Sequence, residues 1–210
     1  MPSEDSQSIR SLRIRVFVDF WNFTLSLRNE ELGFKTDWQP IGRLLAFEAA
    51  NLIDSSIPLV YEGMHVYGSY DRNKPNDARF RNWFVNTLDK MPGVHADLRV
   101  RQKVKAHPRC PACQIATEFC HSCGHDMRGT QEKGIDTRIV TDMIKLAWAN
   151  AYDAAVVVSS DRDFVPVAEF LQTKGIKVVH GAFPPLGSEL SQKCWASIRI
   201  PDHLEKFRRA

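Results

Sequence analysis

The stretch KGIDTRIVTDMIKLAWANAYDAAVVVSSDRDF, residues 133–164, decides the fold of this chain. Apolar side chains recur from Ile139 to Trp148 with the spacing of one helix face, which predicts an amphipathic helix. The apolar run 154–158 is typical of a buried strand, and Asp161 and Asp163 follow closely after it. Because open α/β sheets bind ligands outside the carboxyl ends of their strands, we expect chemistry at this point.

A second apolar strand is predicted at residues 14–20, IRVFVDF, and it carries Asp19 near its end and Asn22 just beyond. A carboxylate in so apolar a run is costly to desolvate unless a partner compensates its charge. Helix capping explains Asp136 or Asp163 taken singly. It explains the whole set of acids less well than a shared site does.

The acids are expected to gather, because the carboxyl ends of parallel strands meet at one edge of a sheet. Unpaired carboxylates repel one another by a few kcal/mol per pair at an effective dielectric of about 20. A divalent cation removes this cost, and oxygen-only ligands suit Mg²⁺ or Mn²⁺. The predicted ligands of this catalytic metal are Asp19, Asp136, Asp161 and Asp163.

Three blocks, VFVDFWNF, KGIDTRIVTDM and VVVSSDRDFVPV, resemble the signature blocks of NYN domains, in the LabA/DUF88-like branch of the PIN-like ribonuclease superfamily. The resemblance covers about residues 13–182 and is interrupted by an insert. It implies an α/β fold with a three-layer, doubly wound, mainly parallel sheet of the PIN-like or Rossmannoid kind, and the cysteines of the insert add a small zinc-binding segment to this fold. It also implies metal-dependent ribonuclease activity in an acidic pocket.

The resemblance assigns candidate catalytic residues position by position: Asp19, Asp136, Asp161 and Asp163 match the family's acids, and Asn22 matches its first-block Asn. Two neighbouring positions depart from the family pattern. Phe20 stands where the first block usually has Gly, and Ser160 stands where the third block usually has Gly.

Length and composition fit one α/β domain with an insertion. The chain has 210 residues, with 43% hydrophobic and 25% charged residues, as in ordinary globular proteins. A net charge of +3 does not by itself indicate a class of binding partner. No apolar run approaches the ~18 residues of a membrane span, and the polar start MPSEDSQSIR is unlike a secretory signal. We therefore expect no membrane association and a reducing, cytoplasmic compartment.

The chain divides into five predicted parts. Residues 1–11 are a disordered leader, 12–98 and 130–201 form the NYN/PIN-like nuclease domain, 99–129 hold a basic strand and the zinc-binding insert, and 202–210 are a solvated C-terminal tail. Helices are expected at 38–54, 77–91, 164–174 and 188–196, and further strands at 59–70, 176–180 and 198–200.

A basic strand is predicted at residues 99–105. Its alternation would place one row of cations on a single face: Arg99, Arg101, Lys103 and Lys105. Contact with a nucleic acid is favoured because the whole row carries one sign, and such binding should weaken steeply with salt. The alternative is an edge strand whose charges protect it against aggregation.

The predicted helix after Gly134 carries further charges near the acids. Lys133 and Arg138 are candidates for nucleic-acid contact and charge stabilisation beside the pocket. Asp142 lies about 120° around the helix from Asp136, at about 100° per residue, and is expected to face solvent.

Two C-x₂-C pairs punctuate the insert HPRCPACQIATEFCHSCGH. Such a pair directs both sulfurs at one ion, and two pairs supply the tetrahedral four-sulfur set that Zn²⁺ prefers. A closed set of four ligands predicts a structural site. Disulfides are the rival interpretation, and His121 and His125 are possible substitute ligands. The predicted zinc ligands are Cys110, Cys113, Cys120 and Cys123.

The leading hypothesis is a Mg²⁺- or Mn²⁺-dependent ribonuclease that hydrolyses single-stranded RNA. RNA is favoured over DNA by the family resemblance alone. A second hypothesis is a non-catalytic RNA-binding or scaffold protein that uses the basic strand and the zinc insert. A third, an aspartyl phosphatase, usually requires an acid two residues after its nucleophile, where Trp21 stands here. The oligomeric state is left open, with a homo-oligomer as one option.

Overall fold

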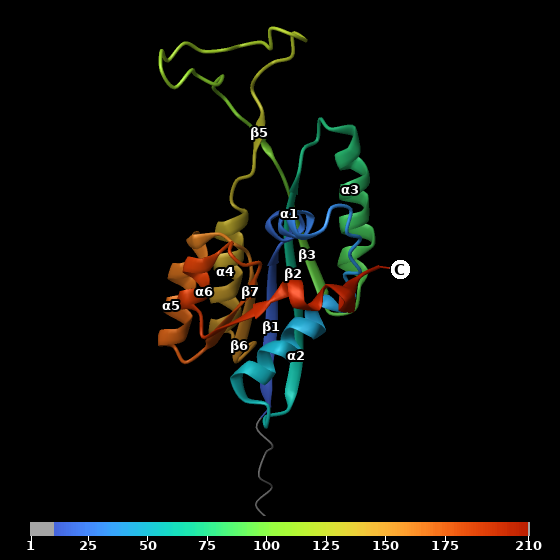
Figure 1. Cartoon of the computed structure of the whole chain (residues 1–210), viewed down its shortest axis with the longest axis vertical. Coiled ribbons are helices and arrows are strands. Elements are labelled where there is room, and N and C mark those ends of the chain that lie inside the picture. The colour runs from blue at the N-terminus through green and yellow to red at the C-terminus, as the bar shows by residue number, and fades with distance from the viewer. Residues whose placement is uncertain (1–10, 210) are drawn as a thin grey trace, which may run out of the picture.

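The computed structural model describes residues 11–209, and in it helices cover both faces of one six-stranded sheet (Figure 1). The strand order is β3-β2-β1-β6-β7-β8, and every neighbouring pair is parallel. This confirms the predicted α/β fold with a doubly wound parallel sheet. Except for Ser11, the leader predicted at residues 1–11 lies outside the described residues, as does Ala210.

The central strand is β1, and the chain builds the sheet outward from it on both sides. The strands are β1 Leu12–Asp19, β2 Leu59–Tyr70, β3 Val94–Val100, β6 Ala154–Val158, β7 Lys177–Ala182 and β8 Ala196–Arg199. The α-helices are α1 Phe20–Glu30, α2 Ile41–Asp54, α3 Pro75–Asn86, α4 Ile135–Trp148, α5 Val165–Thr173 and α6 Ser188–Lys193. Short 3₁₀ helices follow at Leu88–Lys90, Arg162–Phe164 and Ile200–Phe207.

Alternation along the strands divides the core into two layers. In β1, Val16 and Val18 pack with α1 to α3, for example against Leu45, whereas Phe17 packs with Met143 on the side of α4 to α6. All of β6 is buried. Burying each large apolar side chain stabilises the fold by about 1.5–3 kcal/mol, so the two layers hold the strand ends rigidly.

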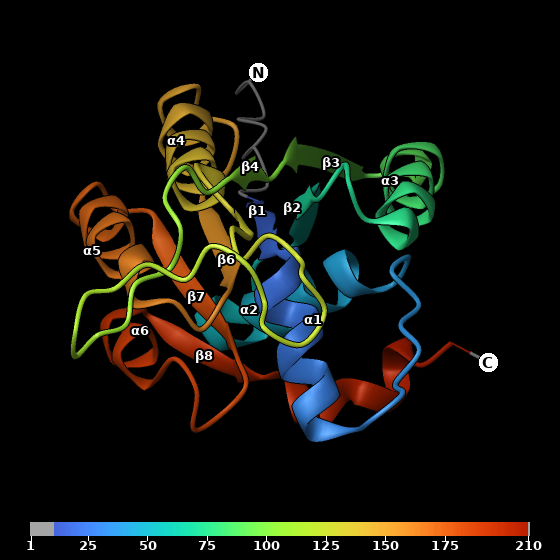
Figure 2. The ribbon, with the colours of Figure 1, turned by 90° about the horizontal axis from the view of Figure 1, so that it is seen from above.

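The insert leaves the body between β3 and α4. Its base is a two-stranded antiparallel ladder, β4 Gln102–Lys103 with β5 Thr130–Gln131. In Figure 1 the insert stands above the carboxyl ends of the sheet strands, and seen from above in Figure 2 it projects over α1, β6 and β7. The prediction of one continuous strand at 99–105 is therefore wrong, because β3 ends at Val100 and the chain turns away before it forms the ladder.

The C-terminal segment is not the solvated tail that the sequence predicted. Phe207 is 2% exposed and contacts the rings of Phe23 and Phe34, at centroid distances of 6.3 and 5.7 Å. The carbonyl of Phe207 accepts a 2.9 Å hydrogen bond from the N–H of Asp37. Arg208 binds Glu31 through both terminal nitrogens. The segment closes the core beside α1.

Within residues 11–209, no helix combines the length and the apolar character that crossing a bilayer requires.

Replacing Phe207 with Ala is expected to lower the free energy of unfolding by about 3 kcal/mol, because it removes a buried ring and leaves a cavity. Urea denaturation measures the change. Arg209→Ala is the matched control, since Arg209 is exposed and its N–H, which bonds the carbonyl of Lys35, is retained. Equal stability of the Phe207→Ala variant and the unaltered protein would instead support the prediction that the C-terminal segment is a solvated tail.

Candidate active site

Asp19 lies at the carboxyl end of the central strand and is the most buried of the four predicted acids, at 8% exposure. One carboxylate oxygen accepts a 3.1 Å hydrogen bond from the N–H of Asn22, so Asp19 is the N-cap of α1. The other accepts a 3.4 Å bond from the hydroxyl of Ser159. The register of β1 with β6 pairs Val18 with Val158, which places Ser159 beside Asp19.

The turn after β6 is tied to the first block of the sequence. The side-chain oxygen of Asn22 accepts a 2.8 Å hydrogen bond from the N–H of Ser160. The hydroxyl oxygen of Ser159 accepts one of 3.2 Å from the N–H of Asp161, and the Asp161 carboxylate caps the N–H of Asp163 at 2.9 Å. These bonds fix where the third-block acids stand relative to β1.

A buried histidine supports the same turn from beneath. His180 contacts the carbonyl oxygen of Ser159 through Nε2 at 2.8 Å and the hydroxyl of Ser191 through Nδ1 at 2.7 Å. Burial lowers the pKa of His180, so the imidazole stays neutral and donates to the carbonyl. A Cβ at Gly187 would lie 2.9 Å from the His180 ring, so only glycine fits there.

Like charges surround Asp19. Burial raises the pKa of Asp19 to about 6, and the charges of Glu132 and Asp136 add to that rise. Burial also raises the pKa of Asp136, assisted by the charges of Asp161, Glu132 and Asp163. Asp136 therefore interacts electrostatically with Asp19 on one side and with Asp161 and Asp163 on the other, while the metal-binding role of the four acids stays a prediction.

Glu132 is the acid that sequence analysis missed. It joins β5 to the first turn of α4 and accepts a short hydrogen bond from the hydroxyl of Ser69, near the end of β2. Its position directly before the second block, which begins with Lys133 and Gly134, was the available signal. The side chains that cap helices are those of Asp19 and Asp161, whereas the N-cap position of α4 is occupied by Gly134.

The donor set suits a hard cation, since all of its members are carboxylates. Within residues 11–209, no group of three or more His, Cys, Asp or Glu side chains is arranged to hold a metal ion by itself. Mg²⁺ in proteins commonly takes one or two carboxylates and completes its shell with water and substrate phosphates. The residues present fit a site of that open kind.

Neither departure from the NYN pattern obstructs the edge of the sheet formed by the carboxyl ends of the strands. Phe20 points into the core, where its ring lies 5.3 Å from Trp38 and 5.0 Å from Phe80. The φ angle of Ser160 is not positive, so its backbone does not require glycine.

The predicted basic row is broken and partly neutralised. Arg99 bonds Asp97 at 2.8 Å, and the ammonium of Lys103 lies 3.3 Å from Asp126. Arg101 is half-buried, and within the described residues its Nε is buried without a hydrogen-bond partner. These side chains do not form the single charged face that the sequence predicted.

Two other predicted contact residues keep their charges exposed. Lys105 lies where the chain enters the insert, and Lys133 lies where it leaves β5 for α4. Neither ammonium group has an ion-pair partner within the described part of the chain. Both are therefore available to a polyanion near the carboxyl side of the sheet.

Arg138 and Asp142 form a separate cluster beside β2 and β3. The guanidinium of Arg138 lies 3.0 Å from Asp97 and 3.1 Å from Asp142, so its charge is compensated within the fold. Asp142 is 8% exposed and accepts a 3.0 Å hydrogen bond from the hydroxyl of Tyr67. The prediction that Asp142 faces solvent is wrong, because β2 extends past the helix face that carries it.

The two cysteine pairs of the insert adopt the same turn. In the first, the N–H groups of Cys113 and Ala112 donate to the sulfur of Cys110 and lower its pKa. The N–H of Gln114 donates to the Cys110 carbonyl at 2.9 Å, with Gln114 in the left-handed region at φ 61°. All five cysteines of the chain are free, so neither pair is a disulfide.

The second pair repeats this geometry. The N–H groups of Ser122 and Cys123 donate to the sulfur of Cys120 and lower its pKa, and Gly124 takes the place of Gln114 at φ 68°. Isolated antiparallel bridges close each turn, Arg109 with Ala116 and Phe119 with Asp126. Each turn presents one pair of sulfurs, and the two pairs could hold one zinc ion if they approached one another, since no three of these side chains converge within residues 11–209.

Comparison with known proteins supports the assignment of the fold. A family profile described as NYN domain matches residues 13–199. The crystal structure of a protein of unknown function from Vibrio parahaemolyticus is similar, with a TM-score of 0.53 and 18% identity over 92% of this chain and 96% of that one. At that identity the likeness concerns the fold alone. No curated protein sequence matches significantly.

Replacing Asp19 with Asn in metal-free buffer at pH 7.5 is expected to raise the free energy of unfolding by about 1–3 kcal/mol. Its carboxyl pKa is raised to about 6 in the folded protein from 3.8, so ionisation costs stability above pH 6. This cost fades as the pH falls toward 3.8. The gain of the variant should therefore be complete above pH 6 and vanish below the unfolded pKa.

Urea titrations in EDTA across that pH range measure the effect. Asp163→Asn is the control, since Asp163 is exposed and the change should stay within about 0.5 kcal/mol. An Asp19→Asn protein that is less stable than the unaltered one at pH 7.5 would contradict the account of the site.

Proposed function

Because the chain belongs to the NYN domain family, a PIN-like family to which nuclease activity is ascribed, we propose that it is a divalent-metal-dependent ribonuclease acting on single-stranded RNA. The placement of Asp19 carries the proposal. A carboxylate largely removed from water and facing Glu132 and Asp136 costs stability, and such groups cluster at functional sites. A divalent cation would offset that cost.

The four acids would have two different roles at the metal. Asp19 and Asp161 would be the primary ligands, and Asp136 and Asp163 would complete the shell directly or through water. When bound, Mg²⁺ or Mn²⁺ would polarise a phosphate oxygen and lower the pKa of an attacking water. Asn22 acts as a positioning residue, because its side-chain oxygen holds the N–H of Ser160.

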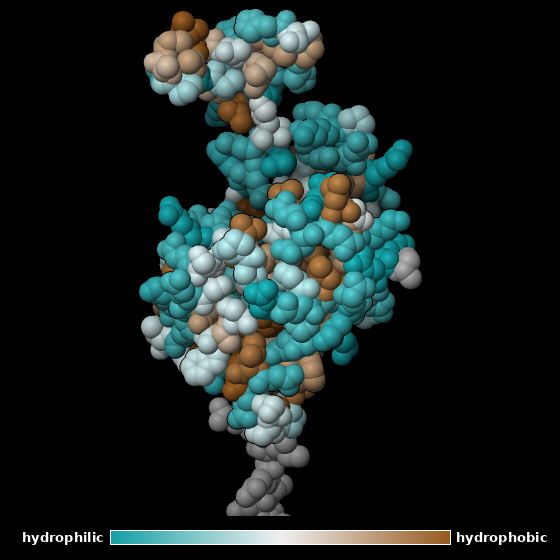
Figure 3. Space-filling model, in the orientation of Figure 1, coloured by the Kyte–Doolittle hydropathy of each residue, from teal (hydrophilic) through white to brown (hydrophobic). Residues whose placement is uncertain are grey.

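The substrate path is suggested by the insert, which stands above the carboxyl edge (Figure 1). Lys105 and Lys133 flank the two ends of the insert, and both are exposed. Phe119 is 57% exposed and Ile115 69%, and hydrophobic atoms are visible on the insert in Figure 3. A strand with splayed bases fits between such a surface and an acidic edge better than a duplex does.

The insert would hold one structural Zn²⁺ through Cys110, Cys113, Cys120 and Cys123. Thiolate is the form that binds zinc, and N–H groups already favour thiolate at the first cysteine of each pair. The insert joins the body through the short β4–β5 ladder. Zinc would therefore supply the rigidity that so small a loop lacks.

The nuclease proposal is tested with labelled single-stranded RNA and Mn²⁺. Asp161→Asn should lower the cleavage rate at least about 100-fold, which corresponds to about 3 kcal/mol of transition-state stabilisation. Asp202→Asn is the control, since Asp202 is 57% exposed and paired with Arg199. EDTA should abolish cleavage by every variant.

Two outcomes would contradict this function. Cleavage that persists equally in the Asp161→Asn protein would come from a contaminant. RNA binding without cleavage in any divalent ion would instead establish the non-catalytic RNA-binding protein, in which no acid has a chemical role.

The zinc proposal predicts about one zinc ion per chain by mass spectrometry of the metal content. Cys110→Ser with Cys113→Ser should remove it, and Cys194→Ser should retain it, since the Cys194 thiol lies outside the insert and burial raises its pKa to about 12. Losing zinc should expose residues 104–129 to protease while the melting temperature of the sheet stays the same. Unchanged zinc content in the double variant would refute the assignment.

A further inference from the structure

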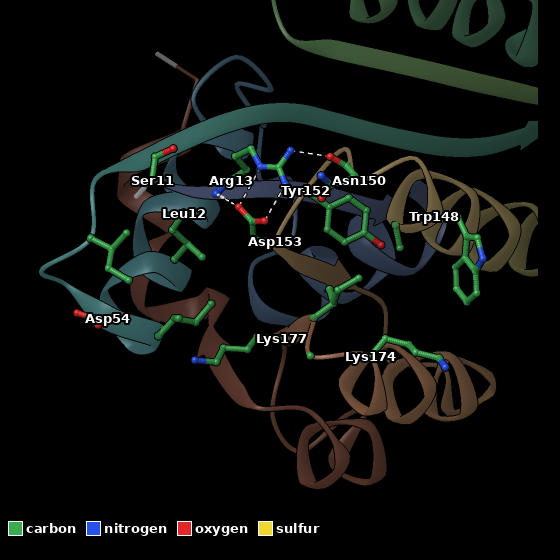
Figure 4. A pocket seen from close by; sticks show the side chains of 15 residues that line it. Ser11, Leu12, Arg13, Asp54, Trp148, Asn150, Tyr152, Asp153, Lys174 and Lys177 are labelled. Atoms are coloured by element: carbon green, nitrogen blue, oxygen red, sulfur yellow. Dashed lines mark hydrogen bonds and ion pairs between the residues drawn. The ribbon is translucent and has the colours of Figure 1, made fainter. Parts of the chain in front are cut away.

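A groove of about 920 Å³ opens at the amino ends of the strands, on the side opposite the acidic edge (Figure 4). Three of its lining residues lie at the amino ends of strands: Leu12 begins β1, Asp153 directly precedes β6, and Lys177 begins β7. The nuclease mechanism uses none of these residues. The groove therefore needs an explanation of its own.

An aromatic ring is held in a fixed position on the rim. Trp148, the last residue of α4, is 62% exposed. One face of its indole stacks on Phe170, with centroids 5.6 Å apart and planes 9° apart. The ammonium of Lys174 lies 5.9 Å from the Phe170 ring centroid. The indole is thus preorganised by its neighbour while most of its surface remains in contact with water.

Two ammonium groups line the same groove, those of Lys174 and Lys177. Neither has an ion-pair partner within residues 11–209. The ammonium of Lys177 lies 4.3 Å from the ring centroid of Trp195, which is 56% exposed. Contact with aromatic rings orients both cations without neutralising them.

The carboxylates of the groove are already engaged. Asp153 accepts hydrogen bonds from the guanidinium of Arg13 at 2.7 and 3.0 Å, and Arg13 also bonds Asn150. Asp54 accepts bonds from the N–H and the hydroxyl of Ser56, at 2.9 and 2.6 Å. Asp54 keeps its negative charge and interacts electrostatically with Lys177, so the three cations of the groove (Arg13, Lys174 and Lys177) exceed its two carboxylates (Asp54 and Asp153) by one charge.

We propose that this groove is a second RNA-binding site, in which a base stacks on Trp148 and a backbone phosphate lies against Lys174 and Lys177. A ring with an open face beside unpaired cations is the combination that binds single strands without sequence preference. The choice of RNA as the ligand rests on the proposed function. The site would make the enzyme prefer substrates that extend well beyond the bond being cut.

The distance between the two sites sets the required substrate length. They lie at opposite ends of β1, whose 8 residues span about 26 Å. A short oligonucleotide at the acidic edge cannot reach the groove, whereas a long one can pass around the body to it. Only long RNA can occupy both sites at once, so groove variants should remove most of the affinity advantage of long over short RNA.

The experiment measures the anisotropy of fluorescein-labelled oligouridylates of 4 and 20 nucleotides, in EDTA, with the full-length chain. Trp148→Ala, and separately Lys174→Glu with Lys177→Glu, should raise the Kd for the 20-mer at least about fivefold and bring it closer to that of the 4-mer. Trp148→Phe should restore most of the affinity. Lys90→Glu is the control for one charge reversal, since Lys90 is 70% exposed and lies outside the groove.

A Kd for the 20-mer within twofold of the unaltered protein in both groove variants would overturn the proposal. So would a Trp148→Ala protein that changes from dimer to monomer with unaltered RNA affinity, because the groove would then be a contact between copies of the chain. Binding is measured on uncut RNA without divalent ions. The groove can therefore fail while cleavage stands, and cleavage can fail while the groove stands.

Discussion

The desolvated carboxylate of Asp19 is the constraint on which the rest of the structure depends. It stands at the end of the central strand, almost out of water, and like charges from Glu132 and Asp136 face it. Among residues 11–209, two hydrogen bonds, from Asn22 and Ser159, offset that cost directly. The remainder is compensated elsewhere, by apolar layers that bury β6 completely and lock both faces of β1. A large, well-packed sheet is what makes an unfavourable local charge arrangement tolerable.

Parallel topology converts distant sequence blocks into neighbours. Because β1 pairs with both β2 and β6, the first block, the end of β2 and the third block reach one edge together. The bond between Asn22 and the N–H of Ser160 then ties the first block to the third. The second block enters from β5 through Glu132, which reaches Ser69 on β2. Asp19 and Glu132 are thus positioned by side-chain contacts from elsewhere in the chain, those of Ser159 and Ser69, whereas Asp161 is held by Ser159 of its own block.

Much of this arrangement could be predicted from the sequence, and the failures share one cause. The strands could be predicted because they are apolar, β-branched runs. The acids at their ends, such as Asp19 and Asp161, could be found from the same local pattern. Asp142 could not be placed, because its burial depends on Tyr67 from a strand far along the chain. Phe207 was missed for the same reason, since its partners Phe23 and Phe34 lie near the other end of the sequence. Local periodicity carries no information about such contacts.

The narrow neck formed by β4 and β5 has an evolutionary consequence. The insert departs after the edge strand β3 and returns before α4, and its ends are held by the two residue pairs of the ladder, a hydrogen bond from the N–H of Val104 to the carbonyl of Gly129, and the ion pair of Lys103 with Asp126. A different module with the same separation between its ends could be grafted there without altering the core or any strand register. Under the proposed function, substrate choice and bond-breaking chemistry would then diversify independently among descendants of one ancestral scaffold.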